Sequence, residues 1–229
     1  MIETGAALSG ITFPKASDPR SASRGEFVYK TLLQAIRSGK LRPGHRIREE
    51  EIAQSLKVSR TPVREAIQLL NARRLLAFAP GRGIVVMELT RQQVMELYAM
   101  REVLEGAAAR FAAQYASDDE IAVLRSLSQE FKAETAPAKL AAINLRFHRA
   151  IYDAARNRYV LEALNNLEDA LSLLPGTTYA ARGRHASGVR EHRAIITAIE
   201  KRDPDAAEAA SRAHIREAQR ARLALMAQG

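Results

Sequence analysis

The 229-residue sequence contains no cysteine and no tryptophan, and aromatic residues make up only 5% of it. Without cysteine, disulfide bonds, thiolate metal sites and cysteine nucleophiles are excluded, so any metal must be held by histidine, carboxylate or amide side chains. Hydrophobic residues still reach 47%, nearly all of them aliphatic or alanine. This composition favours packed helices over a β-sandwich, and the length is sufficient for two small domains.

Long apolar runs are also missing. No stretch approaches the ~20 apolar residues that a membrane span needs, and residues 1–23 lack the apolar core of a signal peptide. We therefore expect a cytoplasmic protein with no membrane partner. Residues 1–21 are rich in Gly, Ser, Pro and Ala without sustained periodicity, and we interpret them as a disordered arm.

The positive charge is distributed unevenly along the chain. The net charge is +9; residues 1–90 hold 15 Lys or Arg against 8 Asp or Glu, whereas residues 91–229 hold 20 against 18. A basic N-terminal third is expected of a segment that meets phosphate groups, although a basic solvated face is the commoner cause of such an excess.

The pattern of residues 22–88 predicts three helices and a hairpin. Apolar residues at near-helical spacing predict a first helix that ends at Ser38, and further helices are expected over residues 49–56 and 60–73. Two short extended runs then flank the turn at residues 80–83, PGRG, which indicates a β-hairpin. This order describes a winged helix-turn-helix, followed by a linker at residues 89–90.

The helix expected from residue 60 has one apolar face, because Val63, Ile67 and Leu70 are spaced to pack inward. The opposite face carries donors suited to base edges and phosphates, namely Arg60, Thr61, Arg64 and Gln68. The alternative is that these arginines only solvate a face and pair with nearby acids. Further DNA contacts are predicted for the hairpin tip at Gly81, Arg82 and Gly83 and, less directly, for Arg48.

Four segments of this region resemble the DNA-binding domain of GntR-family regulators: residues 41–44 (LRPG), 51–53 (EIA), 58–66 (VSRTPVREA) and 80–83 (PGRG). The resemblance implies that Arg60, Thr61, Arg64 and the hairpin tip contact operator DNA. One departure is Glu50, where some members of the family place a DNA-contacting arginine. That contact is therefore in doubt.

Residues 91–229 have a helical period throughout and predict an antiparallel all-α bundle, so the fold class is mainly α. Helices are expected near residues 91–115, 118–134, 138–156, 158–173, 187–202 and 204–226. Thr90, Ser117 and Pro204 fit the starts of helices. Residues 177–188 lack an apolar pattern, and we interpret them as a mobile loop.

Three of the five histidines have informative spacing. His192 and His214 each lie 11 residues from Asp203, so in a hairpin that turns there both rings stand about 16 Å from the turn and can meet. Asn144 and His148 share a helix face at i and i+4 and add an oxygen and a third imidazole. This set suits a divalent metal such as zinc or nickel, whereas any one of these histidines alone is more often a core residue.

Residues 91–229 resemble the FCD ligand-binding domain of FadR-type GntR regulators. The residues that carry the resemblance are Leu97, Arg101, Glu105, Asn144, Phe147, His148, Glu191, His192, His214 and Ile215. It implies a metal held by three histidines and an acidic residue, here replaced by Asn144, and an effector that carries a carboxylate. Arg101 corresponds to the effector-facing arginine or else pairs with Glu102 or Glu105; Tyr98 and Asn165 are further candidate effector contacts.

Together these patterns predict a homodimeric, ligand-responsive transcription regulator, with repression relieved by a small organic acid as the expected direction. It would bind a palindrome in double-stranded operator DNA, since two-fold symmetry doubles the base contacts. A three-histidine metal hydrolase is the rival interpretation. It needs a general base beside a metal-bound water, but Glu191 is expected on another helix face and no HExxH motif occurs. A nucleic-acid-associated structural protein also fits the charge but leaves the histidines unused.

Overall fold

The computed structural model describes residues 23–227, so the arm predicted over residues 1–21 lies outside the described part. The described residues form two compact units. The first contains residues 23–89 together with Glu168–Pro175, a segment that the sequence analysis grouped with the C-terminal domain. The second contains Thr90–Leu167 and residues 176–227.

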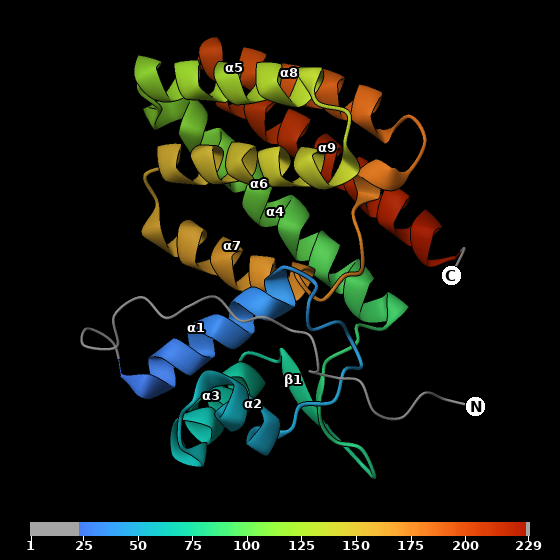
Figure 1. Cartoon of the computed structure of the whole chain (residues 1–229). Helices are drawn as coiled ribbons and strands as arrows, with labels where there is room; N and C mark the ends of the chain where they lie inside the picture. Colours follow the sequence, from blue (N-terminus) through green and yellow to red (C-terminus); the bar gives the residue numbers. More distant parts are fainter. Residues whose placement is uncertain (1–22, 228–229) are drawn as a thin grey trace. The chain divides into compact units, whose positions relative to one another are not determined.

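The first unit has three helices and a hairpin in the predicted order (Figure 1). The elements are α1 (Arg24–Arg37), α2 (Glu49–Leu56), α3 (Arg60–Ala72), β1 (Leu76–Ala79) and β2 (Gly83–Val86). The strands are antiparallel, with Leu76 opposite Val86 and Ala79 opposite Gly83. Gly81 and Gly83 adopt φ of 73° and 76°, a left-handed conformation that favours glycine and closes the hairpin.

The core of the first unit is aliphatic. Val28, Leu32 and Ile36 of α1 are buried against Val63 and Leu70 of α3 and other apolar side chains. Leu173 belongs to the same cluster, and the adjacent Asp169 is paired with both Arg37 and Arg73. The segment from residue 168 to 175 is therefore an integral part of this unit.

The second unit is helical. Its elements are α4 (Arg91–Tyr115), α5 (Asp118–Ala133), α6 (Pro137–Ala154), the larger part of α7 (Arg158–Leu171), the short 3-10 helix η1 (Thr178–Ala180), α8 (Arg184–Glu200) and α9 (Pro204–Met226). Capping boxes at Thr90 and Ser117 and the Asp203 cap before Pro204 satisfy backbone N–H groups at three of the helix starts. These local signals explain why the predicted starts of α4, α5 and α9 agree with the structure.

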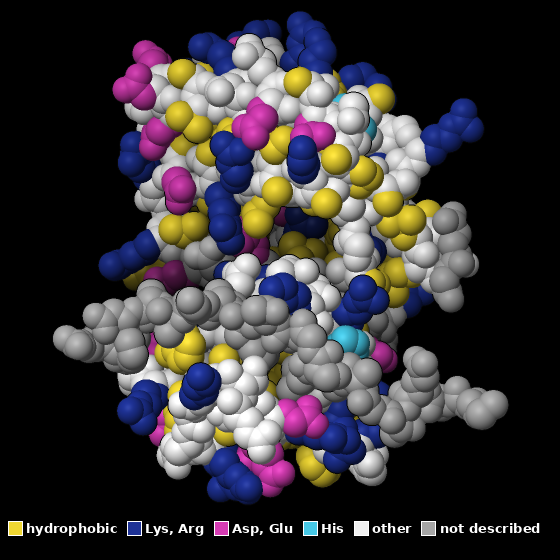
Figure 2. Space-filling model, in the orientation of Figure 1, with side chains coloured by type: hydrophobic (Ala, Val, Ile, Leu, Met, Phe, Trp, Pro, Cys, Tyr) yellow, Lys and Arg dark blue, Asp and Glu magenta, His cyan; other side chains and the backbone are white. Residues whose placement is uncertain are grey.

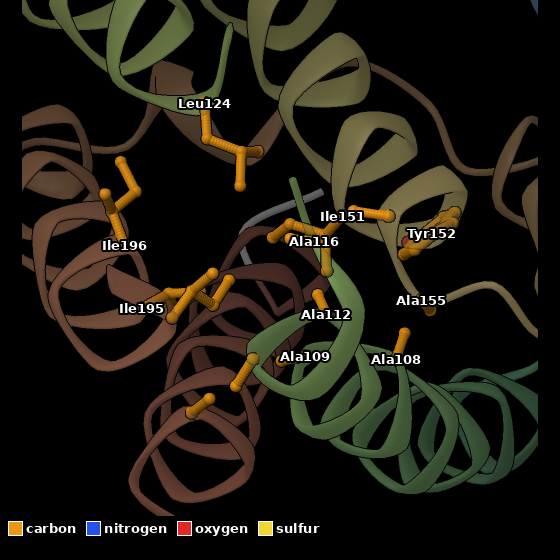
Figure 3. Packing of buried hydrophobic residues seen from close by; sticks show 14 of the residues in the cluster. Ala108, Ala109, Ala112, Ala116, Leu124, Ile151, Tyr152, Ala155, Ile195 and Ile196 are labelled. Carbon is orange, nitrogen blue, oxygen red and sulfur yellow. The ribbon is translucent and has the colours of Figure 1, made fainter. Parts of the chain in front are cut away.

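Small side chains let the helices of this unit pack closely. Four alanines of α4, Ala108, Ala109, Ala112 and Ala113, are fully buried, and α4 packs mainly along α9. Figure 3 shows Ala108 pointing toward Ala155 and Tyr152 at the end of α6, and Ile151 of α6 and Ile195 of α8 belong to the same cluster. An alanine-rich contact shortens the distance between helix axes, so a core with few aromatic residues is still well filled.

The prediction of a loop over residues 177–188 was wrong. η1 occupies residues 178–180 and α8 begins at Arg184, directly after Gly183 with φ of 78°. Gly188 lies inside α8, and a Cβ there would approach the Phe131 ring to 3.2 Å. The glycine is thus a packing residue rather than a helix breaker.

Among the described residues, no helix is long and apolar enough to cross a membrane.

Candidate DNA interface and histidine site

α3 presents the predicted polar face to solvent. Val63, Ile67 and Leu70 are buried, as the spacing predicted. Arg60, Thr61, Arg64 and Gln68 are exposed. The side chains of Arg60 and Arg64 are 59% and 61% exposed, so this face is accessible to a partner. Arg48, at the start of α2, is exposed as well.

These arginines pair with the acidic first turn of α2. Arg60 Nη2 lies 2.7 Å from Glu50 Oε1, Arg64 Nε donates to Glu49 Oε2 at 2.7 Å, and Arg48 pairs with Glu51. The nearby acids anticipated as partners are therefore those of α2. In Figure 2, exposed basic side chains of this unit lie beside acidic ones. Exposed pairs of this kind contribute only about 0–1 kcal/mol each, so phosphates can replace the carboxylates.

The hairpin tip is exposed at Gly81 and Arg82, with Gly83 half-buried. Arg82 Nη2 donates to the Gly44 carbonyl at 2.8 Å, which ties the tip to the turn before α2. A Cβ at Gly81 would meet no atom within 4 Å. Glycine is needed there for its backbone conformation and leaves the tip without a side chain between backbone and partner.

The histidines predicted to meet are together in the second unit. His148 of α6, His192 of α8 and His214 of α9 are all buried, and one ring nitrogen of each lies within 4.8 Å of the others. The ring centroids of His192 and His214 are 5.1 Å apart, as expected from their equal separation from Asp203. His45 and His185, given no role by the sequence, lie outside this cluster; His185 instead contacts the Phe131 carbonyl.

Two series of interacting side chains, each in the order Arg–Glu–His, end at the cluster. In the first, Arg101 pairs with Glu105 Oε1, while Glu105 Oε2 lies 2.6 Å from His148 Nδ1. In the second, Glu191 Oε2 lies 2.9 Å from Arg184 Nη1 and 2.7 Å from His214 Nδ1. A carboxylate at Nδ1 fixes a proton on that nitrogen and leaves the Nε2 lone pair available.

The two free nitrogens face each other, since His148 Nε2 and His214 Nε2 are 3.1 Å apart. Two lone pairs at this distance repel unless a proton or a cation lies between them. Ligands at about 2.0–2.1 Å from one ion are separated from each other by roughly 3.0–3.4 Å. The spacing therefore fits two neighbouring metal ligands.

Asn144 contributes an oxygen to the same place. Its Oδ1 lies 3.0 Å from His192 Nε2 and accepts a hydrogen bond of 2.7 Å from the Tyr179 hydroxyl. His192 Nδ1 is buried and has no hydrogen-bond partner among the described residues. Three imidazoles and an amide oxygen, with coordinating capacity left unused, fit a divalent transition metal.

Burial keeps His192 and His214 in the form that binds metal. Burial, with the neighbouring imidazoles, holds the pKa of His192 well below its usual value, and burial and His148 do the same for the pKa of His214. Burial alone would raise the pKa of Glu105, but Arg101 and His148 outweigh it and lower that pKa well below its usual range. Neutral imidazoles supported by charged carboxylates are the protonation states that a metal site requires.

The predicted effector contacts are only partly brought together. Tyr98 and Arg101 are buried on α4, with the Arg101 guanidinium 4.9 Å from the Tyr98 ring centroid. Arg101 also makes the alternative pair with Glu105, so burial beside the site and pairing coexist. Asn165 is exposed on α7, and no contact joins it to the histidines in the described part of the chain. It does not belong to this cluster.

Sequence reasoning missed Arg184 and misjudged Glu191. Arg184 is 5% exposed, and its guanidinium lies 5.5 Å from the Tyr179 ring centroid. Glu191 does face away from His192 on α8, but that direction leads to His214 on α9. The signal for both was the spacing of seven residues between Arg184 and Glu191, which places them on one face only if the helix already begins at Arg184.

A pocket of about 340 Å³ lies elsewhere, between α5 and α6. Its lining residues are Val123, Ser126, Leu127, Arg146, Arg149, Ala150 and Asp153. None of the clustered histidines lines it. We therefore assign it no part in the histidine site.

A winged helix-turn-helix with an exposed polar third helix, followed in sequence by a helical unit with a buried histidine cluster, defines a DNA-binding transcription regulator. Family comparisons agree. Residues 24–86 match the bacterial regulatory proteins of the gntR family, and residues 96–217 match the FCD domain. The chain belongs to the GntR family of transcription regulators, in the group that carries an FCD domain.

Individual relatives support this assignment over most of the chain. The HTH-type transcriptional regulator YdhC of Bacillus subtilis is 30% identical over 190 residues, covering 81% of this chain and 85% of the relative. A probable D-xylose utilization operon transcriptional repressor of Paenarthrobacter nicotinovorans is 32% identical over 187 residues, covering 80% and 82%. The crystal structure of a GntR regulator from Rhodococcus sp. RHA1 is similar with a TM-score of 0.73 and 26% identity, over 89% of this chain and 99% of that one.

Proposed function

We propose that this regulator binds a palindromic operator as a homodimer and releases it when a small carboxylate binds beside a metal held in the second unit. The observation that carries the proposal is the pairing, in one chain, of an exposed arginine face on α3 with a buried cluster of three histidines. One winged helix makes few base contacts, and a two-fold arrangement doubles them. Repression is favoured because a relative is named a repressor.

Contact with DNA is assigned to the exposed polar side chains of α3 and to the hairpin tip. Arg60 and Arg64 provide bidentate donors for guanine, Gln68 suits adenine, and Thr61 suits phosphate or base. Arg82 with its two flanking glycines reaches phosphate or the minor groove, and Arg48 adds a phosphate contact. Arg48, Arg60 and Arg64 each exchange a carboxylate of α2 for the negative charge of the operator.

The metal is assigned to His148, His192, His214 and the amide oxygen of Asn144, with zinc or nickel as the expected ion. The fit rests on the distance of 3.1 Å between two imidazole nitrogens, the unpartnered His192 Nδ1 and the carboxylates behind His148 and His214. When bound, the ion supplies a positive centre that attracts an anionic ligand. The chain's own part is to orient the imidazoles through Glu105 and Glu191.

The metal assignment is tested by elemental analysis of purified variants. His192→Ala should lose the metal, whereas His185→Ala should keep it, because His185 lies on the same helix but contacts the Phe131 carbonyl instead of the cluster. Full metal retention by His192→Ala would rule out the ligand set. The control separates loss of a ligand from a general disturbance of α8.

The effector is sought by a thermal-shift screen of carboxylic acids on metal-loaded protein, because a specific ligand stabilises the native state by mass action. A compound that raises the melting temperature is then added to a complex with an operator selected from random duplexes. Weaker operator binding in its presence supports the proposed regulation, since the ligand must prefer one of two arrangements. An operator affinity that no stabilising acid changes would contradict it.

The hydrolase interpretation is not favoured. The carboxylates next to the histidines, Glu105 and Glu191, are engaged at the Nδ1 atoms of His148 and His214 and with arginines. They therefore act as supports of the imidazoles instead of as a base beside a water. The matched family and the structural relatives are transcription regulators.

A further inference from the structure

The charged groups around the histidine cluster cancel one another in pairs. Arg101 is paired with Glu105 and Arg184 with Glu191, and each pair is neutral as a whole. The groups proposed to hold the metal, three imidazoles and the Asn144 amide, bind in their neutral forms. A divalent ion among them would therefore keep two positive charges that no ligand compensates.

Two uncompensated charges in a buried place are unfavourable unless an anion joins them. A ligand with one negative charge would leave the site with one positive charge in excess. A ligand with two negative charges would make it neutral. The neutral amide at position 144 thus raises by one the negative charge that the site accepts, compared with a carboxylate at that position.

Arg184 offers a place for a second anionic group. Glu191 and Ser187 both engage Nη1, whereas Nε is buried and has no hydrogen-bond partner among the described residues. The guanidinium lies against the Tyr179 ring, and the hydroxyl of that tyrosine donates to Asn144. Arg184 therefore lies near the proposed metal, with an unused donor of the kind that binds carboxylates.

From this charge balance we infer that the effector is a small dianion, a dicarboxylate with one carboxylate at the metal and the other on Arg184. The inference rests on the proposed metal site and narrows the effector from carboxylates in general to one charge class. Asn144 then sets the preferred charge of the ligand, and Arg184 recognises its second carboxylate.

The test compares linear diacids, from malonate to adipate, with their monoamides, which keep the shape and lose one charge. Each compound is titrated into zinc-loaded and nickel-loaded full-length protein by calorimetry. For the chain length that binds best, the diacid should bind more tightly than its monoamide by about 10- to 100-fold, as expected for one charge-assisted contact. Equal affinities, or no diacid that binds to metal-loaded protein, would overturn the inference.

Asn144→Asp adds one negative charge to the ligand set and keeps the size of the side chain. This variant should still bind metal, but its preference for the diacid over the monoamide should fall by about tenfold or more. An unchanged preference would show that residue 144 does not set the charge of the ligand, and the inference would fail.

Arg184 is tested by Arg184→Gln and by Arg184→Lys, which keeps the charge and guards against loss of folding. Arg184→Gln should weaken binding of the diacid and leave the affinity for the monoamide nearly unchanged. Arg184→Lys should recover part of the preference for the diacid. A purely structural role would lower both affinities equally and contradict the assignment. Arg182→Gln is the matched control, because Arg182 is exposed two residues away.

Failure of the proposed function has a different signature. Wild-type protein that holds no zinc or nickel by elemental analysis would remove the metal site, and the inference with it. Metal-loaded protein that binds monoamides as well as diacids would keep the proposed function and remove only the preference for dianions. The two measurements are made on the same preparation.

Discussion

Arginine and glutamate pair in both units, but in opposite surroundings. Arg60–Glu50 and Arg64–Glu49 lie at the surface, whereas in Arg101–Glu105 the side chains are 11% and 1% exposed. In water an ion pair gains little over its separated, hydrated partners. In a buried place each partner depends on the other, since neither can return to water. The surface pairs are therefore exchangeable, and the buried pairs form a fixed frame around the histidines.

The largest effect is expected from breaking a buried pair. Glu105→Gln keeps the shape but leaves Arg101 without a counter-charge, which should cost about 3–5 kcal/mol of unfolding free energy. The matched control, Glu50→Gln, breaks a surface pair and should change it by about 0–1 kcal/mol. Guanidinium denaturation of metal-free protein measures both. Similar losses of unfolding free energy for the two variants would show that the buried pair is no more important for stability than the surface pair.

Removing an arginine that we propose to contact DNA should leave the stability of the protein unchanged and abolish specific operator binding. Arg64→Ala loses a bidentate base contact, worth about 1–3 kcal/mol in each half-site, while the melting temperature should stay at the wild-type value because the side chain is largely exposed. Operator and random duplexes are compared by fluorescence anisotropy. Arg125→Ala, which breaks the surface pair with Glu200 in the second unit, is the control. Operator binding by Arg64→Ala at wild-type strength would refute the role of α3.

An intermediate effect is expected at Asp169, where a buried carboxylate meets two partly exposed arginines. The Asp169 side chain is 4% exposed, against 36% for Arg37 and 51% for Arg73. Asp169→Asn lets both arginines return to water, so the loss should be about 1–3 kcal/mol, that of hydrogen bonds to a charged group. Chemical denaturation checks the value. A loss of unfolding free energy as large as that of Glu105→Gln would mean that exposure of the two arginines does not reduce the cost of breaking the pairs.

The sequence predicted local structure better than it predicted contacts between helices. The starts of α4, α5 and α9 follow from capping residues at Thr90, Ser117 and Asp203, whose signals lie within one turn. The start of α8 was predicted three residues too late, at residue 187, because residues 177–188 lack an apolar pattern. The glycine at position 188 of this helix is explained by the Phe131 ring of α5, a neighbour distant in sequence.

For the histidine site as well, features set within one helix were predicted and contacts between helices were not. Equal spacing from Asp203 and an i, i+4 pattern on α6 were enough to predict which imidazoles meet, because both follow from helix geometry. The contact of Glu191 with His214 depends on how α8 and α9 are rotated about their axes, which no spacing within one helix contains. Arg184 was missed for the related reason that its helix was predicted to begin after it.

The smallest effect is expected from the carboxylates that pair with the arginines proposed to contact DNA. Arg60 must leave Glu50 before it reaches a phosphate or a base, so Glu50→Gln removes this competition and one repulsive charge. Because a surface pair contributes at most about 1 kcal/mol, the gain in affinity should not exceed roughly fivefold for each half-site.

The gain should apply to operator and random duplexes alike, since phosphates attract the freed arginine whatever the sequence. The ratio of the two affinities should therefore remain near its wild-type value, and both gains should shrink as salt screens the charges. Glu200→Gln, which frees Arg125 in the second unit, should change neither affinity. If Glu50→Gln weakened operator binding selectively, Glu50 would itself take part in base recognition, and the surface pairs of α3 would be as fixed as those around the histidines.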